Sequence, residues 1–160
     1  MDSMRSGILL CLGLSAALMA ADYTGPKPPK KDVPYLLHAN HLIETEAGEA
    51  HESGGKKNTS YVISGAASTA KTPLAEPIFI LDSSQLSPEQ LELYRLDTKN
   101  GQREVVLSQS RKHSEIGPFH MVVTRLGGTL YKIEVDEPLQ DGEYSLSPNG
   151  SNRVFCFEIY

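Results

Sequence analysis

The sequence predicts an all-β protein: an antiparallel sandwich of about eight to nine strands, with one short helical turn near residues 87–90. Short runs rich in Val, Ile, Tyr and Phe recur along the chain, separated by turn formers at intervals of about eight to twelve residues. Several of these runs alternate apolar and polar residues, as in a strand with one buried face and one wet face. Scarcely any segment has the 3.6-residue apolar period of a helix.

The first 21 residues have the composition of a secretory signal peptide. One early cation, Arg5, precedes an apolar run from Ile8 to Ala21, and polar Asp22 follows at once. The run is shorter than the roughly 20 apolar residues that a membrane-spanning helix needs. We expect cleavage near Ala20 or Ala21, export to the periplasm or the extracellular space, and no transmembrane span after cleavage. The alternative is an uncleaved anchor.

Charge and cysteine content narrow the possible functions. The formal net charge is −5, and it stays there after cleavage because Asp2 and Arg5 are both removed. An acidic chain binds nucleic acid poorly, because neutralising phosphates supplies most non-specific affinity. Only Cys156 remains after cleavage, so no intramolecular disulfide can form.

We divide the mature chain into two parts. Residues 22–35 hold a run of prolines and lysines, TGPKPPKKDVP, with almost no apolar side chains, and we expect an extended linker. Residues 36–160 have the length of a single domain and form the predicted sandwich.

The domain begins with a predicted hairpin whose tip is SGGKKN, residues 53–58. This placement sets His51 opposite Thr59, with Glu44 and Glu46 on a wet face, where they would keep the sheet soluble. A helix is the alternative, but the partner segment TSYVIS is strongly strand-like.

The remaining elements follow from their apolar runs and turn residues. PIFILD is a short apolar run typical of a buried strand, and SPEQ suits one helical turn capped by Ser87. Asn100-Gly101 and Gly127-Gly128 indicate two hairpin tips. The predicted strands after the helical turn cover residues 91–96, 103–108, 119–126, 130–136, 143–147 and 154–159.

The most specific local pattern is LQDGEYSL, residues 139–146. Its Leu139, Gly142 and Tyr144 resemble the tyrosine corner of immunoglobulin-like Greek-key sandwiches. The resemblance implies that the tyrosine hydroxyl bonds to upstream backbone and that Leu146 points into the core. It implies an architecture and no ligand. The whole chain also resembles uncharacterised exported bacterial proteins, which supports bacterial export.

Histidines are the candidate metal ligands, and the strand pattern scatters them. Residues three apart on a straight strand point to opposite faces, so His38 and His41 could not share an ion there. The candidates for a zinc or copper site are His38, His41, His51, His113 and His120. We prefer the interpretation that they are separate surface histidines.

The sequence contains no G-x-S-x-G elbow, phosphate-binding loop or H-E-x-x-H pair. Cys156 lies between two phenylalanines, so we expect a buried structural thiol. The sequence therefore favours a non-enzymatic envelope module without a cofactor, whose partner is an unknown protein or envelope component and whose oligomeric state is open. The alternatives are a periplasmic zinc or copper protein and a hydrolase whose residues converge from separate loops.

Overall fold

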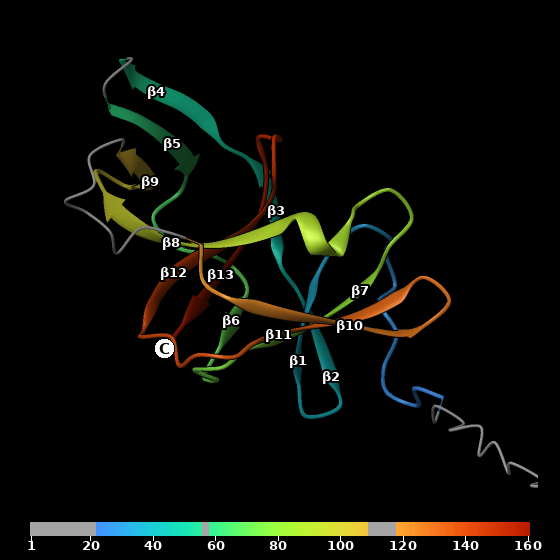
Figure 1. Cartoon of the computed structure of the whole chain (residues 1–160). Helices are drawn as coiled ribbons and strands as arrows, with labels where there is room; N and C mark the ends of the chain where they lie inside the picture. Colours follow the sequence, from blue (N-terminus) through green and yellow to red (C-terminus); the bar gives the residue numbers. More distant parts are fainter. Residues whose placement is uncertain (1–21, 56–57, 109–117) are drawn as a thin grey trace, which may run out of the picture.

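The computed structural model describes residues 22–55, 58–108 and 118–160, and it confirms the all-β sandwich (Figure 1). The one helical element in these residues is a 3₁₀ turn, η1 (Pro88–Gln90). No helix in the described residues has the length and apolar character needed to cross a membrane. As predicted, proline occupies the first turn of η1, but Ser87 makes no side-chain cap; its carbonyl accepts the Gln90 N–H instead.

The first sheet has five strands in the order β10-β11-β7-β1-β2, and all its pairings are antiparallel. Their bounds are β1 (Tyr35–His38), β2 (His41–Glu44), β7 (Ile78–Asp82), β10 (Met121–Gly127) and β11 (Leu130–Val135).

The second sheet has the order β3-β13-β12-β8-β9-β5-β4, and a short β6 adds to β13 in parallel. Their bounds are β3 (Glu46–Glu49), β4 (His51–Gly55), β5 (Asn58–Ser64), β6 (Lys71–Thr72), β8 (Leu91–Lys99), β9 (Gln102–Ser108), β12 (Gly142–Pro148) and β13 (Arg153–Ile159).

The strand orders correspond to the immunoglobulin-type Greek key. In that topology strands A, B, E and D form one sheet and C, F and G the other. Here β1, β7, β11 and β10 occupy the A, B, E and D places, and β8, β12 and β13 occupy the C, F and G places. The segment from β2 to β6 is an addition between the first two of these strands, β1 and β7.

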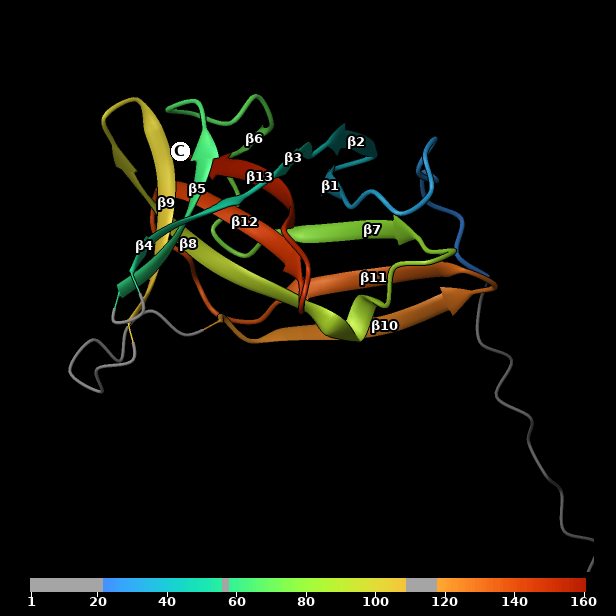
Figure 2. The same ribbon diagram turned by 90° about the horizontal axis from the view of Figure 1, so that it is seen from above.

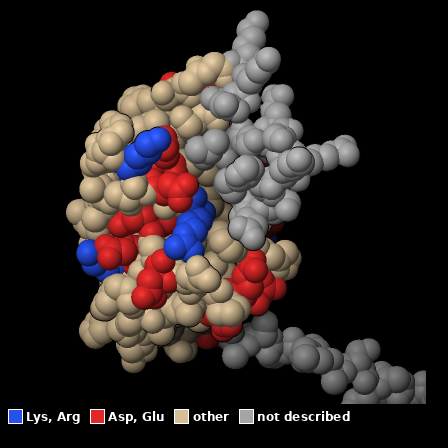
Figure 3. All heavy atoms as spheres, turned by 90° about the vertical axis from the view of Figure 1, so that its left-hand side faces the viewer, with Lys and Arg blue, Asp and Glu red and all other residues tan. Residues whose placement is uncertain are grey.

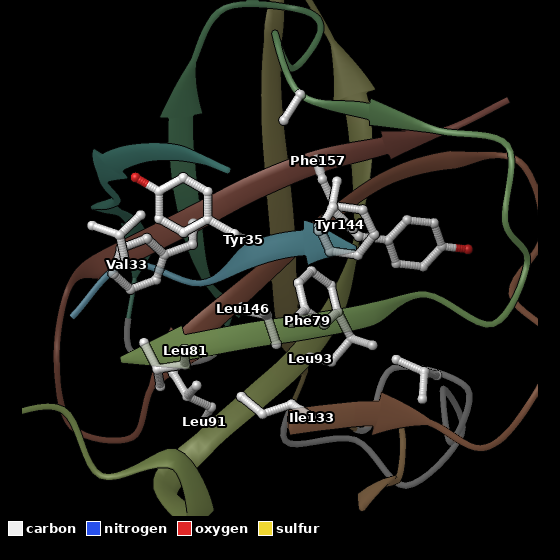
Figure 4. Packing of buried hydrophobic residues seen from close by; sticks show 14 of the residues in the cluster. Val33, Tyr35, Phe79, Leu81, Leu91, Leu93, Ile133, Tyr144, Leu146 and Phe157 are labelled. Atoms are coloured by element: carbon white, nitrogen blue, oxygen red, sulfur yellow. The ribbon is translucent and has the colours of Figure 1, made fainter. Parts of the chain in front are cut away.

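The main core lies between the two sheets and is built from alternate residues of their strands (Figure 4). The Phe79 and Phe157 rings meet edge to face with centroids 5.2 Å apart, and Tyr144 stacks on Phe157 at 5.6 Å. Leu146 is fully buried in the same cluster, as predicted. Aromatic pairs of this kind add about 0.5–1.5 kcal/mol beyond the area they bury.

The hydrogen bond expected of a tyrosine corner is present. The Tyr144 hydroxyl donates to the Gln140 carbonyl over 2.7 Å, and Leu139 is buried beside it. Gly142 has φ +151, and a Cβ there would lie 3.1 Å from the Arg95 guanidinium. A side chain at this position would therefore be strained and crowded.

The second sheet rolls up until its two edges meet. Its edge strands β3 and β4 are consecutive in the chain and are joined by Ala50, whose N–H donates to the Asn152 carbonyl over 2.7 Å. One continuous segment thus pairs with β13 at one end and β5 at the other. The strands form a small barrel, which Figure 2 shows on one side of the molecule while β7, β10 and β11 extend to the other.

The predicted first hairpin is wrong in its register. His51 pairs with Val62 instead of Thr59, because the paired strands continue through the predicted tip as far as Gly55 and Asn58. The residues before Ala50 leave the hairpin, since β3 pairs with β13. A tighter hairpin precedes it: β1 and β2 are joined through Ala39 and Asn40, and Ala39 has φ 53. The sequence analysis missed this turn because Ala-Asn is a weaker turn signal than Asn-Gly.

Residues 22–34 have no strand or helix, and they contact the domain. The Asp32 carboxylate accepts hydrogen bonds from the backbone N–H groups of Ser84, Gln85 and Leu86 over 2.8–2.9 Å. Burial opposes ionisation of Asp32, but these bonds and one from the Ser84 hydroxyl hold the pKa of its carboxyl well below the usual range. Lys31 adds an ion pair with Asp82 at 3.2 Å.

Candidate functional site

The barrel has an interior of its own because its strands bury both faces. On β13, Phe155 and Phe157 point into the main core, whereas Val154 and Cys156 point into the barrel. Side-chain alternation along a strand produces this division. The barrel interior is a second apolar cluster formed by Ala50, Ile63, Leu96, Val105, Val154 and Cys156, with Tyr61 and Tyr94 packed against it.

One end of the barrel is closed by a buried charged network around Arg103. Arg103 is 1% exposed, and its Nη2 lies 2.6 Å from Glu46 Oε1 while its Nη1 donates to the Ser68 hydroxyl over 2.6 Å. The Gly65 carbonyl accepts from its Nε over 2.9 Å. Glu143, also buried, accepts hydrogen bonds from the Ser68 backbone and hydroxyl.

The network keeps Arg103 and Glu46 charged, and burial keeps the neighbouring Cys156 thiol neutral. Burial disfavours both ions, but their mutual hydrogen bond and charge interaction raise the pKa of Arg103 and lower that of Glu46. Burial raises the pKa of the Cys156 thiol to about 12. A thiol with this pKa is a poor nucleophile and a poor metal ligand at neutral pH, which agrees with the structural role predicted for it.

The other end of the barrel is open and forms a hollow of about 370 Å³. Its floor is formed by Tyr61, Tyr94 and four apolar residues of the barrel interior: Ala50, Ile63, Val105 and Val154. Its polar wall comes from Glu92, from Ser145 and Ser147 on β12, and from the β12–β13 turn, residues 148–152. The mouth of a β-barrel is a common position for a ligand site, and the volume is in the range of small-ligand pockets.

Glu92 is the one charged residue among the described residues that line the hollow. The Tyr94 hydroxyl donates to its Oε2 over 2.7 Å, and the Asn149 amide donates to its Oε1 over 3.3 Å. Burial raises the pKa of Tyr94, and the adjacent Glu92 carboxylate raises it further, so the hydroxyl remains a donor. These two bonds orient the carboxylate at the mouth.

The arrangement can bind a ligand through an apolar floor, two aromatic rings and oriented oxygens. Nucleophilic catalysis needs a nucleophile within hydrogen-bond reach of a base. Neither histidine nor cysteine occurs among the described residues that line the hollow. The Ser145 and Ser147 hydroxyls lie 3.3 Å from each other.

The structure brings two of the candidate histidines together. His38 and His41 are direct partners across the β1–β2 hairpin, so the expectation that they face opposite sides is wrong. Their side chains share a face, with Cβ atoms about 4.5–5.5 Å apart as for any directly opposed pair. Both are exposed at the hairpin tip.

The other candidate histidines lie apart from this pair. His51 begins β4, and Figure 1 shows β4 and the β1–β2 hairpin at opposite ends of the molecule. His120 Nδ1 lies 2.7 Å from Asp136 Oδ2 on the exposed surface, and His113 falls outside the described residues. Among the described residues, no three His, Cys, Asp or Glu side chains gather closely enough to hold one metal ion.

The sequence analysis predicted neither the charged network at the closed end of the barrel nor the hollow at its open end. In the segment REVV, Arg103 lies two residues before Val105, so both side chains point to the same, inward face of the strand. This spacing was the signal that could have predicted a buried arginine. Glu46 was expected to solubilise an exposed sheet, but it pairs with Arg103 instead. Tyr61 and Tyr94 pack against the smaller apolar cluster and also line the hollow.

Acidic and basic side chains are interspersed on the face at the left of Figure 1 (Figure 3). This face does not form a continuous basic patch of the kind that binds nucleic acid. Comparisons with models of protein families, with curated proteins and with solved structures found no match to this chain.

Proposed function

We propose that this protein is an exported, non-enzymatic interaction module that binds its ligand in the hollow at the barrel mouth. The observation that carries the proposal is the combination of an open cavity of about 370 Å³ with a carboxylate fixed at its rim by Tyr94 and Asn149. Apolar pockets with a few convergent polar groups are the usual form of a binding site.

Two further observations support this proposal. The apolar run of residues 8–21 followed by polar Asp22 has the composition of an export signal. The ionised residues of the barrel interior are engaged with one another, because Arg103 contacts Glu46 at 2.6 Å and Glu143 at 3.7 Å. Those residues hold the barrel together and leave Glu92 as the charged group available to a ligand.

A fragment screen by protein-observed NMR tests the proposal. We expect a set of small fragments to shift the resonances of Tyr61, Val105 and Ser145. Ser147→Phe, which would fill the mouth, should abolish these shifts. The matched control Thr124→Phe places the same ring on exposed β10 and should leave them unchanged. A diverse library that shifts none of these resonances in the folded wild-type protein would refute the proposal.

A zinc or copper protein is the second candidate, and the His38–His41 pair favours it. Two imidazoles on one face of a hairpin can both ligate a borderline-soft divalent ion. Copper or zinc at a hundredfold excess over its dissociation constant should then stabilise the fold by about 2.7 kcal/mol. His38→Ala should remove the gain and His51→Ala should retain it. An unchanged melting temperature in the wild type would eliminate this candidate.

A further inference from the structure

We infer that the hollow at the barrel mouth receives a cationic nitrogen group, an ammonium or guanidinium carried on a short apolar stem. The inference rests on the proposed function, since it names the ligand class of the same site. It follows from three features of the hollow: the acceptors that remain free, the charges that line it and the rings beside them.

The Glu92 carboxylate retains acceptor capacity after its internal bonds are made. A carboxylate offers about four lone-pair sites. The Tyr94 hydroxyl uses one on Oε2 and the Asn149 amide uses one on Oε1. Both donors are neutral, so they orient the carboxylate without balancing its charge. About two acceptor positions therefore remain for a charged donor.

The part of the lining that the structure describes contains no competing cation. None of the described residues that line the hollow is Lys, Arg or His. The nearby network at the closed end differs in this respect, because Arg103 there compensates Glu46. A half-buried carboxylate without a cation in its own pocket attracts a positive ligand and repels an anion.

Two aromatic rings and an apolar floor also suit a ligand with a cationic end and an apolar stem. Tyr61 and Tyr94 both line the hollow, and the negative face of a tyrosine ring attracts a cation within about 6 Å. Ile63, Val105 and Val154 form the floor beside them. A flexible methylene stem can pack on this floor while its charged end reaches Glu92.

Three probes of equal length test the charge preference: n-butylammonium, n-butanol and butanoate. Each is titrated at neutral pH while the NMR resonances of the mouth residues are followed. We expect n-butylammonium to bind about tenfold more tightly than n-butanol. Both probes can donate a hydrogen bond to Glu92, but only the ammonium adds an attraction between opposite charges. Butanoate should bind most weakly. A lysine-containing peptide and an arginine-containing peptide, run beside free n-butylammonium, distinguish a protein ligand from a small amine.

Glu92→Gln isolates the contribution of the carboxylate charge. It should remove the preference for n-butylammonium while leaving n-butanol affinity unchanged. The matched control Glu89→Gln makes the same charge change on the exposed η1 turn, outside the hollow, and should preserve the preference. Equal or tighter binding of n-butanol by the wild type would overturn the charge assignment and leave the binding site intact. If fragments of every charge class fail to bind at the mouth, the proposed function itself fails.

Discussion

Arg103 Nη2 lies 2.6 Å from Glu46 Oε1, although Arg103 is only 1% exposed. The pair joins β9 to β3, two strands on different sides of the barrel. Backbone groups of Ser64 and Gly65 accept further hydrogen bonds from the same guanidinium. One side chain thus ties together three segments at the closed end.

Arg103→Met should lower the free energy of unfolding by about 3–5 kcal/mol, because it leaves Glu46 and Glu143 without their buried cation. Urea denaturation of the variant and the wild type measures the change. Lys99→Ala, on an exposed part of β8, is the control and should change stability by less than about 0.5 kcal/mol. Equal midpoints for Arg103→Met and the wild type would contradict a structural role for the network.

Tyr144→Phe should destabilise the domain by about 1 kcal/mol, because it removes the hydroxyl bond to the Gln140 carbonyl and leaves the ring packing unchanged. Thermal and urea denaturation would both report the loss. Tyr160→Phe makes the same change at an exposed position and should be neutral. A neutral Tyr144→Phe variant would show that the corner hydrogen bond contributes nothing to stability.

Asp32→Asn should make the free energy of unfolding depend less on pH in the acidic range. The folded-state pKa of Asp32 is lowered, so its contribution is present above the unfolded value of about 3.9 and is lost as pH falls toward the folded value. The variant should therefore be less stable than the wild type at pH 7, and the difference should shrink below about pH 4. Denaturation midpoints across this range measure it. Asp97→Asn makes the same substitution on the exposed part of β8, away from the Asp32 contacts, and is the control. A constant difference between Asp32→Asn and the wild type would contradict the prediction.

The Cys156 thiol should resist modification in the folded protein, because burial raises its pKa to about 12 and excludes reagents. In a Cys11→Ser background, an aromatic disulfide reagent at pH 8 should release colour only after denaturant is added. Adding an exposed thiol through Ser84→Cys provides the positive control, since it should react at once. Rapid reaction of native Cys156 would show that the barrel opens readily.

The sequence pattern predicted those structural features that depend only on residues close together in the chain. Asn100-Gly101 forms the predicted tip between β8 and β9, with φ values of 52 and 74. Tyr144 makes the expected corner bond because its partner lies four residues away. The position of Cys156, opposite Phe155 and Phe157, followed from strict alternation along one strand.

The same reasoning could not predict which strands pair when they are far apart in the sequence. Nothing in the composition of residues 46–55 indicates that one segment changes partner at Ala50, pairing with β13 before it and with β5 after it. The assignment of Glu46 to a wet face failed for this reason. The register prediction at His51 failed because the β4–β5 pairing extends to Gly55 and Asn58, inside the segment predicted to be the tip.

By itself, the sequence determined the class of secondary structure, the turn at Asn100-Gly101 and the alternation of side chains along β13, because these depend on contacts a few residues apart. Only the tertiary structure decided that the second sheet closes on itself, that Arg103 meets Glu46 inside it, and that Glu92 faces two tyrosines at its mouth. Such contacts depend on which strands pair across tens of residues. The alternation of side chains along one strand does not indicate which strand will lie beside it.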